Sequence, residues 1–180
     1  MTSEAIRLRP PEREDLEFLR DLSNDEVVRR NVVGWDWPLS KAGQESWFAS
    51  ADANRKTRRF IIETTDGMRV GVTGLWEIDW HSRHALSSIK LGANSAARGR
   101  GFGTAALQLM MEFAFNDVGL NRLHTTIIAG NEASLAIYRD KSGWREEGVL
   151  REHVWRDGKF VDLIQLGITR SDYDTWSELH

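Results

Sequence analysis

The alternation of apolar and polar positions along the chain predicts about seven short strands. These strands are the runs Ile6–Arg9, Arg59–Thr64, Met68–Ile78, Ala85–Leu91, Arg122–Ile128, Trp144–Trp155 and Lys159–Ile168. Apolar residues that recur at spacings of three and four predict about four helices and one short continuation. These helical runs are Glu12–Asp21, Asp25–Asn31, Ser40–Asp52, Thr104–Phe115 and Asn131–Asp140. The mixed order predicts an α+β fold with a mixed, mainly antiparallel central sheet of about seven strands and helices on both faces.

The composition is that of an ordinary globular domain. The chain has 180 residues, of which 41% are hydrophobic, so we expect one domain over residues 1–180. The net charge of −3 gives no reason to expect a nucleic-acid partner. No apolar run approaches the roughly 20 residues that span a bilayer, so no membrane partner is expected. The chain contains no cysteine, which excludes disulfides, thiol nucleophiles and cysteine-bound zinc and suits a cytoplasmic protein. We expect no metal site.

One stretch combines a strand, a glycine-rich loop and a helix. The strand ends near Leu91, and the sequence Arg98-Gly-Arg-Gly-Phe-Gly103 directly precedes the strongest helical run. The first turn of a helix leaves backbone N–H groups without partners, and its dipole makes that end positive. Glycines let a ligand approach the backbone closely, and the two arginines add positive charge. The stretch therefore predicts a site for a phosphate or pyrophosphate.

This loop differs from two known nucleotide-binding patterns. The pattern GxxxxGK[ST] is absent, which argues against a P-loop site. The segment Gly101-x-Gly103-x-x-Ala106 formally matches a dinucleotide fingerprint. In that fingerprint the first glycine directly follows the strand, whereas about ten residues separate the strand from Gly101 here. An NAD-type dinucleotide site remains a weaker rival.

The segment Arg98-x-x-Gly101-x-Gly103 resembles the pyrophosphate loop of the GCN5-related N-acetyltransferases (GNAT). A second segment, Asn131-x-x-Ser134-x-x-x-Tyr138, is similar to a motif that lies at the same distance downstream in that family. The beginning and end of the chain resemble the branch that contains ribosomal-protein alanine and spermidine N-acetyltransferases. The resemblance covers almost the whole chain. It implies a GNAT-like fold and an acyltransferase that moves an acetyl group from acetyl-CoA to a primary amine.

The resemblance also assigns roles to individual residues. It implies that the strand before the loop diverges from its neighbour and that backbone groups near Leu91, Gly92 and Ala93 bind the pantetheine arm. The cofactor-binding set that it implies is Leu91, Gly92, Ala93, Arg98, Gly99, Arg100, Gly101, Phe102, Gly103, Thr104, Asn131 and Ser134. It implies that Tyr138 is the catalytic residue that protonates the leaving thiolate, because a phenol keeps its proton at neutral pH. Packing is the alternative role of Tyr138, and helix capping that of Asn131.

Two departures from the family pattern affect these roles. Many relatives carry a glutamate where this chain has Ser88, and a serine cannot supply that negative charge. The base must then be another group, such as Glu77 or His84 acting through water, or the amine must arrive neutral. The second departure is one extra residue between Tyr138 and Gly143, which is expected to widen the end of the helix.

The sequence says least about the identity of the acceptor amine. The resemblance places an aromatic and acidic segment on the acceptor side, and the candidate substrate-binding residues are Trp35, Asp36, Trp37, Glu77 and Ser88. Such a lining suits a cationic amine. A peptide N-terminus, a polyamine and an amine-bearing small molecule all remain open as acceptors, as does a homodimer. The alternative function is a non-catalytic acyl-CoA sensor or interaction module on the same fold.

Overall fold

A computed structural model describes residues 5–92 and 99–179 of the chain. Most of these residues lie in strands and helices that follow the predicted order. The strands are β1 (Ile6–Arg9), β2 (Arg58–Thr64), β3 (Arg69–Asp79), β4 (His84–Leu91), β5 (Arg122–Ile128), β6 (Arg145–Arg156) and β7 (Lys159–Thr169). The α-helices are α1 (Leu16–Asn24), α2 (Glu26–Asn31), α3 (Lys41–Ala51), α4 (Phe102–Glu112), α5 (Glu132–Leu135) and α6 (Arg170–Ser177). Short 3-10 or π segments are η1 (Arg13–Asp15), η2 (Phe113–Asp117) and η3 (Ala136–Asp140).

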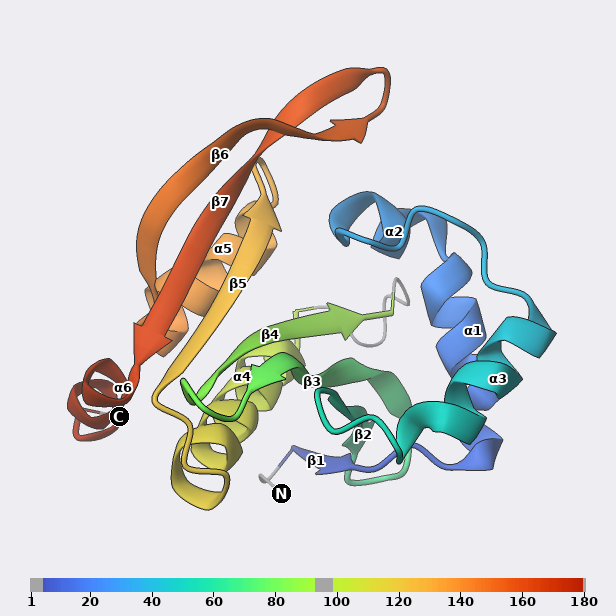
Figure 1. Ribbon diagram of the computed structural model, residues 1–180, viewed down its shortest axis with the longest axis horizontal. Helices are drawn as coiled ribbons and strands as arrows, with labels where there is room; N and C mark the ends of the chain where they lie inside the picture. The colour runs from blue at the N-terminus through green and yellow to red at the C-terminus, as the bar shows by residue number, and fades with distance from the viewer. Residues whose placement is uncertain (1–4, 93–98, 180) are drawn as a thin grey trace.

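The seven strands form a single sheet in the order β1-β2-β3-β4-β5-β7-β6. Every neighbouring pair is antiparallel except β4 and β5, which run parallel (Figure 1). The expectation of a mixed, mainly antiparallel sheet is therefore confirmed.

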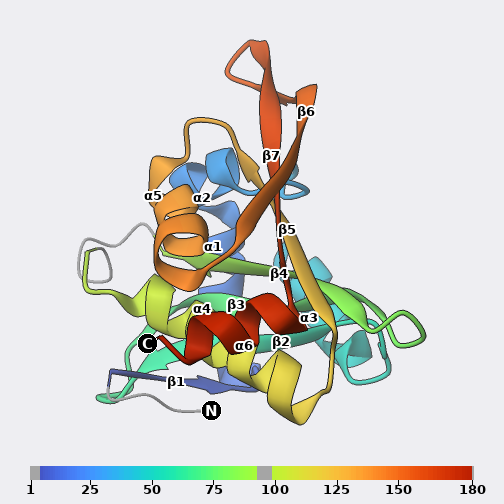
Figure 2. The same cartoon turned by 90° about the vertical axis from the view of Figure 1, so that its left-hand side faces the viewer.

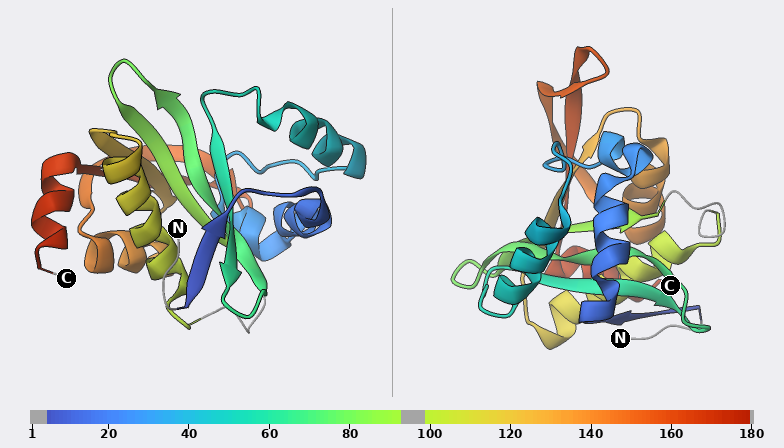
Figure 3. Two further views of the ribbon diagram at one scale, coloured as in Figure 1. Left: turned by 90° about the horizontal axis from the view of Figure 1, so that it is seen from below. Right: turned by 90° about the vertical axis from the view of Figure 1, so that its right-hand side faces the viewer.

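Helices cover both faces of the sheet, as the alternation predicted. On β2, Ile61 points to the face where α1 and α2 pack, together with Val72 of β3. Its neighbours Phe60 and Ile62 point to the opposite face, where α4 and the larger apolar core lie. Figure 3 shows α1 and α3 on one side of the sheet and α4 and α6 on the other. The two faces can therefore bind different molecules while sharing the same strands.

The sheet opens between β4 and β5. These strands pair only from His84 with Arg122 to Leu86 with His124. Beyond Leu86 the two strands diverge, and Figure 1 shows them spreading apart like a V. The backbone edges that face each other across the opening are not paired with a strand there, which leaves their N–H and C=O groups free to bind a ligand. This divergence was expected from the family resemblance.

The C-terminal part of the chain adds a long hairpin and a helix. Strands β6 and β7 extend beyond the rest of the sheet in Figure 2. Helix α6 was not predicted, although Thr169 and Asp172 form a capping box at its start. Its Tyr173 stacks on Phe115 at 4.9 Å between ring centroids. In the part of the chain that the structure describes, no helix has both the length and the apolar character needed to cross a membrane.

Candidate active site

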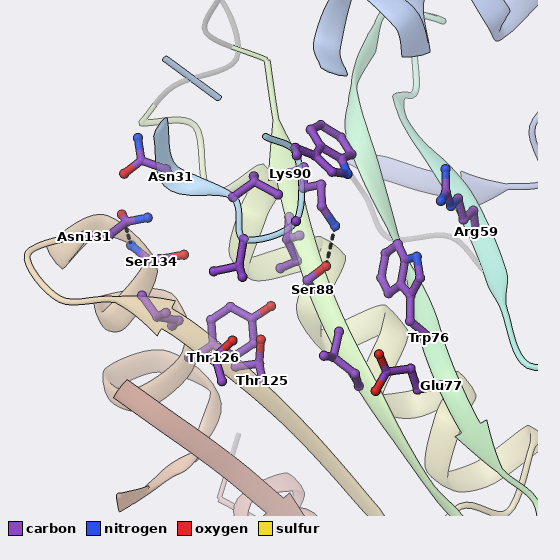
Figure 4. Close-up of a pocket in the computed structure, with 18 residues that line it drawn as sticks. Asn31, Arg59, Trp76, Glu77, Ser88, Lys90, Thr125, Thr126, Asn131 and Ser134 are labelled. Carbon is purple, nitrogen blue, oxygen red and sulfur yellow. Dashed lines mark hydrogen bonds between the residues drawn. The ribbon is translucent and has the colours of Figure 1, made fainter. Parts of the chain in front are cut away.

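A cavity of about 410 Å³ lies where β4 and β5 separate. Figure 4 shows side chains from several elements around it, including Trp76 and Ser88 from neighbouring strands and Asn131 from the opposite side. Among the described residues, those that line the cavity are Asn31, Val32, Val33, Gly34, Trp35, Arg59, Trp76, Glu77, Leu86, Ser88, Ile89, Lys90, Thr125, Thr126, Ile127, Asn131, Ser134 and Tyr138. The cavity therefore joins the α2 side of the sheet to the α5 side through the opening.

The glycine-rich loop lies at the start of α4. Gly99 and Gly101 have φ angles of 72° and 78°, in the left-handed region that glycine adopts at little cost. Gly101 is the N-cap of α4, and no side chain caps the helix there. Its first-turn N–H groups therefore remain available to an anion. A Cβ atom on Gly103 would lie 2.8 Å from Ile137, so this glycine allows α4 to pack closely against η3.

At the end of β4, some backbone groups bond to β3 and others turn toward the opening between β4 and β5. The Gly92 N–H donates to the Val70 carbonyl at 2.9 Å and is thus committed to β3. Hydrogen-bonding direction alternates along a strand, so the backbone groups of Ile89 and Leu91 turn toward the opening. Ala93 and Arg98, which the sequence assigned to the cofactor, lie outside the described residues.

Tyr138 lines the cavity and is only 2% exposed. Its hydroxyl oxygen is buried and makes no hydrogen bond of standard geometry within the described part of the chain. Burial raises the pKa of Tyr138 well above its usual value, and the nearby Thr125 side chain and Ile89 backbone oppose this shift only in part. The phenol therefore stays protonated at neutral pH and can donate a hydrogen bond into the cavity.

A π-helical segment accommodates the extra residue after Tyr138. The segment η3 runs from Ala136 to Asp140, and a π turn holds one residue more than an α turn. The Tyr138 ring packs edge-on against Trp144, with 4.9 Å between centroids and 85° between planes. The chain leaves the segment through Gly143 at a φ of 71°. The insertion thus widens the helix, as expected, while the tyrosine still lines the cavity.

Asn131 is the N-cap of α5, where its side chain accepts a hydrogen bond from the Ser134 N–H at 3.2 Å. Both residues also line the cavity. The capping role that the sequence offered as an alternative for Asn131 is therefore confirmed. It is compatible with a ligand contact, because the side-chain amide N–H₂ group remains a donor.

Only part of the expected acceptor segment lines the cavity. Trp35, Glu77 and Ser88 do so. Asp36 instead pairs with Arg156 at 3.2 Å, and Trp37 is 85% exposed. Glu77 is the single carboxylate among the described lining residues, so one of the two predicted acidic residues, Glu77, lines the cavity and the other, Asp36, does not.

Lys90 was not predicted as part of the site. Its side chain is 8% exposed, and its ammonium group donates to the Ser88 hydroxyl at 2.5 Å (Figure 4). The ammonium nitrogen lies 4.1 Å from the centroid of the Trp76 ring and 5.2 Å from that of Trp35. Burial, assisted by repulsion from Arg59, lowers the pKa of Lys90 to about 7. A lysine near the end of the strand, on the same face as Leu86 and Ser88, was the available sequence signal.

Arg59 is the second cation that the sequence did not assign to the site. It lies on β2, and its guanidinium carbon stacks 4.4 Å above the Trp47 ring centroid. Its Nε atom is buried and has no hydrogen-bond partner among the described residues. Burial lowers the pKa of Arg59 as well. With Lys90, this arginine makes one side of the cavity positive.

The chain was compared with known families, proteins and structures. Residues 5–143 match the family described as "Acetyltransferase (GNAT) domain". The spermidine N(1)-acetyltransferase of Escherichia coli strain K12 is 29% identical over 96% of this chain and 90% of that protein. The L-amino acid N-acetyltransferase of the same strain is 25% identical over 89% and 96% of the two chains.

A solved structure shows the same fold. The crystal structure of spermidine N-acetyltransferase from Vibrio cholerae, in complex with CoA and spermine, superimposes with a TM-score of 0.85. It is 25% identical and covers 93% of this chain and 97% of its own. The family match extends over well more than half of the chain, and the sheet opening agrees with it. The chain belongs to the GNAT acetyltransferases and is an N-acetyltransferase that uses acetyl-CoA as the acetyl donor.

Proposed function

We propose that a primary amine attacks the acetyl-CoA thioester directly at the opening between β4 and β5. The observation that carries this proposal is the position of the buried Tyr138 hydroxyl in the same cavity as the unpaired edge of β4. The pyrophosphate would lie at the first turn of α4, next to Gly101 and Gly103. The pantetheine arm would then run along Ile89 and Leu91 into the opening. This path brings the thioester to the cavity.

Tyr138 would act as the general acid. When the amine nitrogen forms its bond to the carbonyl carbon, the carbon–sulfur bond breaks and CoA leaves as a thiolate. The phenol is protonated at neutral pH and has no competing hydrogen bond of standard geometry in the described structure. The same burial that raises the pKa of Tyr138 also raises that of a thiol, so the thiolate remains a suitable proton acceptor.

Glu77 would receive the proton that the amine loses, through a water molecule. It is the one carboxylate of the described cavity lining, which gives it a better position than His84, a residue outside that lining. Its backbone has a φ of 52° within an irregular stretch of β3. This irregularity re-aims the side chain at the end of the strand, as β-bulges often do near sites.

The similar proteins suggest two classes of acceptor. The relatives from Escherichia coli and Vibrio cholerae are named for spermidine, which supports a polyamine. Another relative is named for L-amino acids, which supports a small amine that carries a carboxylate. A protein N-terminus is a third candidate from the sequence.

Replacement of Tyr138 by Phe tests the proposal. We expect kcat to fall by about 10²–10³-fold, because general acid catalysis is typically worth this much. The measurement is the initial rate of thiol release from acetyl-CoA across a panel of polyamines, amino acids and N-terminal peptides. The matched control is Tyr173→Phe, which changes the only other tyrosine of the chain; it lies on α6 and stacks on Phe115.

A full rate in Tyr138→Phe would remove the general-acid role. Acetyl-CoA binding without turnover on any amine of the panel would instead favour the acyl-CoA sensor. Binding itself is measured as the rise in melting temperature with acetyl-CoA, for which about 100 times Kd corresponds to about 2.7 kcal/mol.

A further inference from the structure

A buried lysine, Lys90, and a partly buried arginine, Arg59, share the acceptor side of the cavity without an acidic partner. No described carboxylate forms an ion pair with Lys90 or Arg59. Glu77 lies next to Trp76 in Figure 4 and forms no ion pair with Lys90 among the described residues. The Arg59 Nε atom makes no hydrogen bond in the described structure. Buried charges in proteins are normally paired, so this pair of cations is poised for an anion.

The anion is expected to belong to the acceptor rather than to CoA. Side chains of a strand alternate between faces, so Lys90 and Leu91 point to opposite sides of the sheet. Leu91 approaches Gly103 of α4, on the side where the pyrophosphate loop lies. Lys90 points the other way, between Trp35 and Trp76. The charged part of the cofactor and the two cations are therefore on different faces.

A purely structural role accounts for only part of this arrangement. The indole rings stabilise the Lys90 ammonium group, as cation–π contacts do. The Arg59 Nε atom still has no hydrogen-bond partner among the described residues. The two like charges also repel each other, because the charge of Arg59 contributes to lowering the pKa of Lys90. A polyamine would add further positive charge here, whereas an anion would relieve the repulsion.

We infer that Lys90 and Arg59 form a carboxylate-binding subsite and that the acceptor is a small amine bearing a carboxylate, such as an α-amino acid. This inference rests on the proposed attack of an amine at the opening between β4 and β5. The carboxylate would contact Lys90 and Arg59 while the neighbouring amine faces Tyr138, since the Tyr138 hydroxyl lies near the backbone of Ile89, the residue that precedes Lys90. Arg59 supplies forked donors that match the geometry of a carboxylate.

The first test compares matched acceptors. Initial rates of thiol release are measured for the twenty L-amino acids, for their carboxamides, for spermidine and for peptides with an acidic N-terminal residue. We expect an amino acid to have a higher kcat/KM than both its carboxamide and spermidine. Lys90→Met should lower kcat/KM for the amino acid by about 10–100-fold, the range of a hydrogen bond to a charged group. The same variant should change kcat/KM for the carboxamide by less than about threefold.

Three further variants control for folding and for general charge. Lys90→Arg keeps the positive charge and should retain most of the preference for the acid over the amide. Arg59→Met should weaken the preference as Lys90→Met does. Arg58→Met changes the adjacent, exposed arginine of β2 and should leave it unchanged. Each variant is accepted as folded when acetyl-CoA raises its melting temperature as in the wild type.

The second test measures binding without turnover. N-acetyl amino acids, the products expected from this subsite, are titrated against the CoA-bound protein while the intrinsic tryptophan fluorescence, to which Trp35 and Trp76 contribute, is followed. The matched probe is the corresponding N-acetyl amino acid amide. We expect at least about tenfold tighter binding of the acid in the wild type, and equal binding of acid and amide in Lys90→Met.

The two tests separate failure of this inference from failure of the proposed function. Equal binding of the acid and the amide in the wild type overturns the subsite, as does efficient acetylation of spermidine or acidic peptides with no free amino acid accepted. Tighter binding of the acid without any acetyl transfer supports the subsite and contradicts the proposed function.

Discussion

Two groups of charged side chains lie on the same sheet, and they differ in whether the positive charges are paired with carboxylates. The first, here called the balanced cluster, joins Arg9 on β1 to Asp15 and to Glu63 on β2. The second, here called the pocket pair, consists of Arg59 on β2 and Lys90 on β4. Arg59 and Glu63 are four residues apart on one strand. The same sheet therefore holds one set of charges that is neutralised within the chain and another that is not.

In the balanced cluster each carboxylate has at least two basic partners. Asp15 accepts hydrogen bonds from Arg9 at 2.6 and 2.9 Å and pairs with Arg69 at 2.6 Å. Glu63 pairs with Arg9 and Arg7. Burial alone would raise the pKa of Asp15, but the hydrogen bonds from Arg9 and from the Glu12 N–H and the charges of Arg9 and Arg69 lower it overall.

The contrast separates a structural use of charge from a binding use. A buried carboxylate with several donors stabilises the positions of the strands and loops that supply them. A cation withdrawn from water without a carboxylate carries a desolvation cost that the indole rings of the chain offset only in part. Such a cost is compensated when a ligand of opposite charge binds. Changes in the balanced cluster should therefore alter stability, and changes in the pocket pair should alter acceptor choice.

The largest effect is expected when the balanced cluster loses one charge. Asp15→Asn leaves Arg9 and Arg69 without their shared carboxylate. We expect a loss of about 3 kcal/mol in the free energy of unfolding, the lower end of the range for breaking buried ion pairs, because both arginines retain some contact with water. Urea unfolding at pH 7 measures it.

The matched control for Asp15→Asn is Glu26→Gln, which removes an exposed carboxylate from its pair with Arg30 on α2. It should change the free energy of unfolding by less than about 0.5 kcal/mol. If both variants have equal effects, the balanced cluster is not a structural element of the kind described above.

An intermediate effect, on the choice of acceptor, is expected when a substitution places a carboxylate of the chain beside the pocket pair. Ser88→Glu would place a carboxylate next to Lys90, whose ammonium group now donates to the Ser88 hydroxyl. The new pair would occupy the site of the acceptor carboxylate. We expect kcat/KM for amino acids to fall by about 100-fold, or about 2.7 kcal/mol, with a relative gain for spermidine.

Ser88→Gln is the control for Ser88→Glu, because it has the same length without the charge. It should lower kcat/KM for amino acids and for their carboxamides by equal factors. Equal selectivity in the two variants would show that size rather than charge decides the choice of acceptor.

The sequence predicted the course of the backbone around the site better than the positions and partners of the charged side chains. The strand–loop–helix order around Gly101 and the placement of Tyr138 follow from local patterns and from motif spacing, and the sheet order agrees with the family. Asp36 was assigned to the acceptor side because the family resemblance places its segment there, yet it pairs with Arg156 from the distant β6. Lys90 and Arg59 were missed because their pairing state depends on contacts between strands, which no local pattern records.

The smallest effect is expected when the uncompensated cation is removed. Lys90→Met should raise the free energy of unfolding by about 1–2 kcal/mol at pH 6, since a hydrophobic side chain replaces a buried charge that the indole rings stabilise only in part. The pKa of Lys90 is lowered to about 7, whereas an unfolded lysine titrates near 10.4. Between these values the unfolded wild type binds more protons than the folded one, so the wild type gains stability as pH rises from 7 to 10.

The advantage of Lys90→Met should therefore be largest at or below pH 6 and fall steadily as the pH rises from 7 to 10. Urea unfolding of both proteins at pH 6, 8 and 10 measures it, with Lys159→Met, a change at the exposed first residue of β7, as the control that stays within about 0.5 kcal/mol. An advantage that does not depend on pH would mean that Lys90 is compensated within the chain. In that case the pocket pair would resemble the balanced cluster, and the reason to expect an anionic acceptor would be lost.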